Sequence, residues 1–133
     1  MTSTIVPVYA AVLALLFFVL SVRTLRLRRS LRIAIGDAGN QALLRAMRVH
    51  SNFAEYVPLT LLLLYFVEAR GASAWLVHAL GVSLLIGRAV HAYGVSQVKE
   101  NYRHRVLGMT MTFTCLLVCS VYLLVSSALW IGT

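Results

Sequence analysis

The sequence has little charge, few acidic residues, and few cysteines and prolines. Of its 133 residues only 12% are charged, four are acidic, two are cysteine and two are proline. A soluble domain carries charge on nearer a quarter of its residues, so this composition argues against a soluble protein. Cys115 and Cys119 lie four apart in an apolar run without a nearby histidine, which predicts buried thiols packed as small hydrophobes. Neither a disulfide nor a metal site is expected.

Apolar residues make up 60% of the chain and fall into four long runs, at about residues 5–22, 49–67, 72–91 and 106–130. A helix needs roughly 20 apolar residues to cross the hydrocarbon of a bilayer. None of the runs alternates as the strands of a membrane barrel do, and helices satisfy their own backbone in lipid. The sequence therefore predicts an all-α integral membrane protein, with residues 1–133 forming a single four-transmembrane-helix bundle.

Ten of the twelve Lys and Arg residues fall in two segments, and the net charge is +8. Seven arginines separate the first two apolar runs, Lys99, Arg103 and Arg105 separate the last two, and no charged residue precedes Arg23 or follows Arg105. Lys and Arg collect in cytoplasmic loops, where they also meet anionic lipid, so both termini are expected on the non-cytoplasmic side. Because these cations flank membrane spans and lack interleaved aromatic platforms, no nucleic-acid partner is expected.

Turn residues divide the helices. The glycines of residues 36–40 predict a turn, with Asn40 as the N-cap of a helix that runs from Gln41 to about Ala69. A tight turn is expected at residues 68–73 and a longer basic loop at residues 94–105. The second helix is then long enough for its first turns to project out of the lipid.

Polar residues enter the second apolar run on one helical face. Arg48, Asn52 and Glu55 are spaced i, i+4 and i+7, and Glu55 lies several ångströms inside the hydrocarbon. An unpaired charge costs ~2.5–3.5 kcal/mol at the membrane centre, and somewhat less at this depth. One interpretation is a structural ion pair of Glu55 with Arg48 or with an arginine on another helix. The other is a polar pocket at the cytoplasmic mouth of the bundle.

Two further helices deliver polar residues to the same depth. Arg88 and His91 share a face near one end of the third run, and Arg26 closes the first run. Arg105 lies at the start of the last helix, where a cation opposes the helix dipole, so an anion is expected nearby. Arginine binds carboxylates in a bidentate fashion, and Glu55 suits an ammonium group. Glutathione, with two carboxylates, an amine and a thiol, is one ligand of this description.

The segment RAMRVHSNFAEYVP, residues 45–58, resembles the second-helix signature of the MAPEG family, the membrane-associated proteins in eicosanoid and glutathione metabolism. That signature reads approximately R-x-H/Q-x-N-x-x-E-x-x-P. The matching residues are Arg48, His50, Asn52, Glu55 and Pro58. Arg88 with His91 resembles the family's third-helix pair, Arg105 its fourth-helix arginine, and Arg26 in RLRR its first-helix arginine. The chain is most similar to the short bacterial members, which implies a bacterial inner membrane.

The resemblance implies a homotrimer that binds glutathione as co-substrate between adjacent subunits, near the cytoplasmic face. One subunit would supply Arg26, His50, Asn52 and Glu55, and its neighbour Arg88, His91 and Arg105; Arg48 and Tyr56 complete the binding set. In catalytic members the arginine matched by Arg105 stabilises the thiolate, so Arg105 is the predicted catalytic residue. A nearby cation lowers the pKa of a thiol and so raises its nucleophilic fraction.

The leading hypothesis is a microsomal-type glutathione transferase or peroxidase that detoxifies lipophilic electrophiles reaching it from the bilayer. The alternative is a noncatalytic lipid- or glutathione-binding protein on the same scaffold. A proton-coupled multidrug transporter is disfavoured because Glu55 lies near one interface and the arginines repel cationic drugs. The chain has Val95, Val106 and Met109 where eicosanoid enzymes carry tyrosine or serine, which argues against prostaglandin or leukotriene synthesis.

Overall fold

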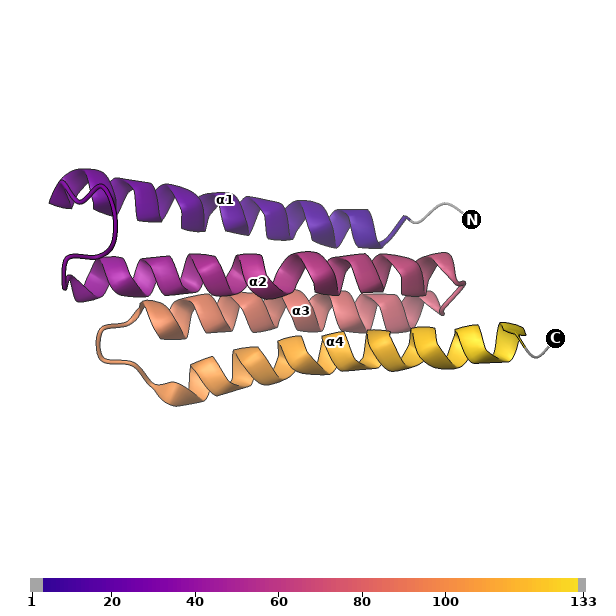
Figure 1. The fold of residues 1–133 in the computed structure, drawn as a ribbon. Helices are drawn as coiled ribbons and strands as arrows, with labels where there is room; N and C mark the ends of the chain where they lie inside the picture. Colours follow the sequence, from indigo (N-terminus) through magenta and orange to yellow (C-terminus); the bar gives the residue numbers. More distant parts are fainter. Residues whose placement is uncertain (1–3, 132–133) are drawn as a thin grey trace.

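The structure, a computed structural model, describes residues 4–131 and consists of four antiparallel helices (Figure 1). The helices are α1 (Val6–Leu31), α2 (Gln41–Ala69), α3 (Ala74–Ser96) and α4 (Tyr102–Ile131). The α1–α2 and α3–α4 connections lie at one end of the bundle, and the α2–α3 turn lies at the other end with both termini (Figure 1). The two basic segments therefore share one end, which we call the loop end.

Local capping explains where α2 begins. The Asn40 side chain accepts a hydrogen bond from the Leu43 amide at 3.0 Å, which confirms Asn40 as the N-cap and Gln41 as the first helical residue. The preceding loop is held by Arg28 of α1. Its guanidinium Nη1 donates to the carbonyls of Ile33, Ala34 and Gly36 at 3.4, 3.3 and 2.9 Å. Arg28, one of the basic residues expected to set membrane topology or meet anionic lipid, thus also has a structural role.

Three helices extend beyond the predicted apolar runs. α1 continues to Leu31, α3 to Ser96, and α4 starts at Tyr102, so the loop predicted at residues 94–105 is only residues 97–101. Hydropathy marks the part of a helix that can lie in lipid, whereas hydrogen bonding lets the same helix continue into water. The loop bounds of residues 94–105 were therefore too wide, because both ends of that segment are helical.

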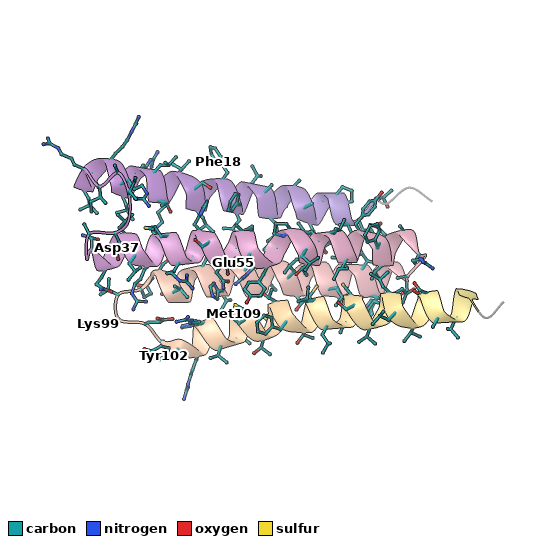
Figure 2. The ribbon with its side chains drawn as sticks, viewed as in Figure 1. Phe18, Asp37, Glu55, Lys99, Tyr102 and Met109 are labelled. Atoms are coloured by element: carbon teal, nitrogen blue, oxygen red, sulfur yellow. The ribbon has the colours of Figure 1, made fainter. Side chains whose placement is uncertain are left out.

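The outside of the bundle is apolar. Leu15, Phe18, Leu117 and Leu124 are among the large hydrophobic side chains that remain exposed, and Phe18 points away from the other helices (Figure 2). Contiguous apolar surface of this kind indicates a membrane environment. Among the described helices, α1, α3 and α4 are long and apolar enough to cross a membrane. α2 falls short because of its polar face, although it runs the length of the bundle beside them (Figure 1).

Glycines bring α3 and α4 into close contact. A Cβ on Gly108 would lie 2.5 Å from the Gly87 carbonyl oxygen and 2.6 Å from His91 Cβ, and a Cβ on Gly94 would lie 2.7 Å from His104 Cβ. Small residues permit such backbone approach between membrane helices. Farther along α4 from the loop end, Cys115 and Cys119 are fully buried free thiols, as predicted.

The N-terminus of α1 is capped by a distant acid. The Glu68 carboxylate, near the end of α2, accepts hydrogen bonds from the amides of Thr4, Ile5 and Val6 at 2.8, 2.8 and 2.9 Å. These amides have no intrahelical partner, and an anion at this position also complements the helix dipole. Glu68, placed in a turn by the sequence analysis, therefore ties α1 to α2.

Candidate binding site at the loop end

Arg88 is the most deeply buried charged side chain of the described residues, with 1% of its surface exposed. Its Nη1 donates to Asn52 Oδ1 of α2 at 2.9 Å, and its Nη2 lies 3.8 Å from Met109 Sδ of α4. Its Nε has no hydrogen-bond partner within residues 4–131. The structure thus brings together two predicted site residues, Asn52 and Arg88, around a buried cation that has only neutral partners.

Arg48 and Arg105, also predicted, line a second feature, a pocket of about 250 Å³ between α2, α3 and α4. Its remaining lining residues are Gln41, Leu44, Arg45, Val95, Glu100 and Tyr102. Arg45 Nη1 donates to Glu100 Oε2 at 2.9 Å and to the Val95 carbonyl at 3.1 Å. Arg105 Nη1 lies 3.9 Å from Glu100 Oε1. We call this cluster the arginine pocket.

Sequence reasoning missed Arg45 and Glu100 in the arginine pocket. An anion was expected near Arg105 because of its place at a helix start, and Glu100 now fills that role. The signal was present in KENYRHR, residues 99–105, where Glu100 is the single acid among basic residues. The role of Arg45 could not be predicted, because only the tertiary fold brings α2 beside the loop of residues 97–101.

Glu55 is exposed on the side of α2, at about the level of Met109 on α4 (Figure 2). Both of the ion pairs identified between described residues involve Glu100, and Glu55 forms none within this part of the chain. The structural ion pair considered for Glu55 is therefore wrong for a single chain. A carboxylate at this depth needs a partner, and the surface on which it lies is open to one.

His50 and Arg26 lie away from the arginine pocket. His50 Nε2 hydrogen-bonds Ser21 Oγ of α1 at 3.0 Å, and its ring stacks on Phe17 at 4.7 Å between centroids. Arg26 is exposed on α1, where it lines a separate cavity of about 660 Å³ with Arg23, Ser30 and apolar residues. In one chain, these two residues do not meet Arg88 or Arg105.

His91 and Tyr56 occupy helix interfaces. His91 is buried against the Gly108 backbone, where α3 and α4 are closest. The ring of Tyr56 meets Phe113 of α4 edge-to-face, with 5.4 Å between centroids. Both residues thus pack against the part of α4 that follows Arg105, and this packing fixes their positions.

The fold and this site define a four-helix membrane bundle with a cation-rich polar pocket at one end. Residues 6–125 match the MAPEG family, and the chain belongs to it. It is 39% identical over 122 residues to "Inner membrane protein YecN" of Escherichia coli strain K12, which covers 92% of this chain and 88% of that protein. The protein of that name from Escherichia coli O6:H1 matches with the same identity and coverage.

Proposed function

We propose that the protein is a membrane-embedded glutathione-dependent transferase or peroxidase that conjugates or reduces lipophilic electrophiles. The observation that carries this proposal is the charge of the arginine pocket. Arg45, Arg48, Arg105 and Glu100 line the pocket, so three cations less one anion leave an excess of two positive charges. Glutathione in its thiolate form has two carboxylates, one ammonium and one thiolate, and so matches this excess in sign and number.

Arg105 is suited to stabilise the thiolate. Half of its side-chain surface is exposed, and the carboxylate oxygen nearest to it lies 3.9 Å away, outside hydrogen-bonding distance. Its guanidinium is therefore free to donate to an incoming anion. A cation beside a bound thiol lowers the pKa of that thiol and raises the population of the nucleophile. Arg48 would bind a peptide carboxylate as a bidentate partner, whereas Arg45 is engaged with Glu100.

A homotrimer would complete the site between subunits. Glu55, His50 and Arg26 lie on surfaces of one chain that do not face its own Arg105, so a neighbouring subunit is the natural source of the other half. Glu55 would then pair with the ligand ammonium, which offsets the cost of its charge in the membrane. We place the protein in a bacterial inner membrane with the loop end in the cytoplasm, which agrees with the name of the matched relative and with the loop charges.

A lipophilic co-substrate would arrive from the bilayer. An apolar groove of about 400 Å³ runs between α1 and α2, lined by side chains that include Phe17, Phe53 and Pro58. Phe17 also stacks on His50, so the groove adjoins one of the proposed glutathione contacts. Apolar pockets with a few polar groups at one end are typical of small-molecule sites.

The test is a titration of glutathione into the detergent-purified protein, followed by thiolate absorbance in the ultraviolet. Arg105→Ala should abolish the thiolate signal, and Glu55→Gln should weaken binding. Arg103→Ala is the matched control, because Arg103 is an exposed arginine of the same helical turn that does not line the arginine pocket. Binding without thiolate would favour a noncatalytic glutathione-binding protein, and absence of binding would overturn the proposal.

A further inference from the structure

Glu100 is an unusual residue for an anion-binding pocket, because it is itself an anion. Its side chain is only 5% exposed, although it lies in the short connection between α3 and α4. Carboxylates are rarely buried unless they are paired, so its contacts should explain its position. Those contacts are with two arginines of the arginine pocket, and they are unequal.

The contact with Arg45 is tight. Arg45 Nη1 donates to Glu100 Oε2 at 2.9 Å, and the same nitrogen donates to the Val95 carbonyl. Both side chains are largely buried, so this charge-assisted bond is shielded from water and salt. It fixes the Glu100 carboxylate in place at the wall of the pocket.

The contact with Arg105 is loose. Oε1 of Glu100 is buried without a hydrogen-bond partner among the described residues, and it attracts Arg105 across 3.9 Å. Half of the Arg105 side chain is exposed. Partly exposed ion pairs of this kind contribute little free energy, so an incoming anion can displace this one readily.

We propose that Glu100 is an internal competitor for the arginine pocket: a fixed carboxylate, anchored by Arg45, that holds Arg105 until an anionic group of a ligand takes its place. Glu100 would therefore weaken anion binding and temper the activation of a thiol at Arg105. The identity of the ligand rests on the function proposed above, whereas the competition itself applies to any small anion.

Glu100→Gln is the sharpest test of this competition. Glutamine has the same shape, and its amide oxygen can still accept the hydrogen bond from Arg45, so only the charge is lost. Removing one opposing charge a few ångströms from the binding cation should tighten anion binding by roughly tenfold. Glu100→Asp keeps the charge and should bind anions as the native protein does.

Asp37→Asn is the matched control for Glu100→Gln. It also neutralises one loop-end acid, in the α1–α2 connection (Figure 2), but Asp37 does not line the arginine pocket. Binding to the purified native protein and to all three variants should be measured by isothermal titration calorimetry, with inorganic sulfate and with glutathione as separate probes. A thermal unfolding curve of each variant reports whether the fold is retained.

Tighter sulfate binding in Glu100→Gln alone supports the internal competitor. If sulfate binding responds in this way but the native protein does not bind glutathione, the competitor stands and the proposed function fails. Equal sulfate affinity in Glu100→Gln and Asp37→Asn overturns the inference, even where glutathione binds and forms thiolate. Tightening in Glu100→Asp of the same size as in Glu100→Gln also overturns it, because loosening of the loop would then be the cause.

Discussion

Replacing Gly108 by alanine should separate α3 from α4 at the point where the site is built. The added methyl carbon would lie 2.5 Å from the Gly87 carbonyl oxygen, 2.6 Å from His91 Cβ and 2.8 Å from the His91 amide nitrogen. Two of these three neighbours are backbone atoms, which no side-chain rotation can move. Real Cβ atoms do not approach other atoms this closely, so the helices must shift.

The expected loss of stability follows from two opposing terms. Overpacking costs typically about 1–3 kcal/mol, and backbone neighbours place this case at the upper end. Alanine recovers about 1 kcal/mol through its higher helix propensity than glycine. The net loss in the free energy of unfolding is therefore about 2 kcal/mol, or roughly a thirtyfold change in the ratio of folded to unfolded protein.

Unfolding in detergent micelles by titration with a denaturing detergent, followed by circular dichroism, would measure this loss. Ala89→Ser is a control, since it adds one heavy atom to an exposed position of α3 and should change stability by less than about 0.5 kcal/mol. Gly108→Ala should also weaken glutathione binding, because Arg105 lies one turn before Gly108 on α4. Unchanged or increased stability of Gly108→Ala would refute the close helix contact.

Three further predictions concern charge. Arg88→Met should stay within about 1 kcal/mol of the native stability, because an apolar side chain of similar size replaces a buried cation that has only neutral partners. Asn52→Ala, which removes the hydrogen-bond acceptor of that cation, should cost about 3 kcal/mol. The opposite order in the same detergent titration would contradict this account of Arg88. Glu68→Ala should cost about 1–2 kcal/mol by removing the cap from the α1 amides, as hydrogen exchange of Ile5 and Val6 would reveal. Glutathione binding should weaken as salt rises from about 0.1 M to about 1 M, which shortens the screening length from ~10 to ~3 Å; calorimetry showing no salt dependence would exclude the arginine pocket as the binding site.

Local features of the sequence predicted much of the fold. The Asn40 cap and the bounds of α2 are confirmed, because a capping side chain and a turn glycine act within a few residues of themselves. The paired buried thiols of α4 are confirmed for the same reason, since residues four apart share a helical face. The loop predicted from residue 94 begins only after Ser96, because hydropathy distinguishes lipid from water and does not distinguish helix from loop.

The candidate site could be predicted only in part. Helical spacing placed Arg48, Asn52 and Glu55 on one face, and the structure brings Asn52 to Arg88. The pairing of Arg45 with Glu100 was missed because its partners are 55 residues apart in the chain. Likewise, nothing within α2 indicates that His50 faces Ser21 and Phe17 of α1.

The sequence by itself determined that the protein is a bundle of four helices with an apolar exterior and two basic connections at one end. Those properties depend on composition and on spacing along one helix, which short-range physics controls. The tertiary structure decided which polar groups meet. The glycine contacts set how closely α3 and α4 approach. The packing of α2 beside α3 buries Arg88 against Asn52 and leaves Glu55 exposed, and the α3–α4 connection puts Glu100 near Arg105. Charges interact over a few ångströms, so their partners follow from helix packing and cannot be read from their order in the chain.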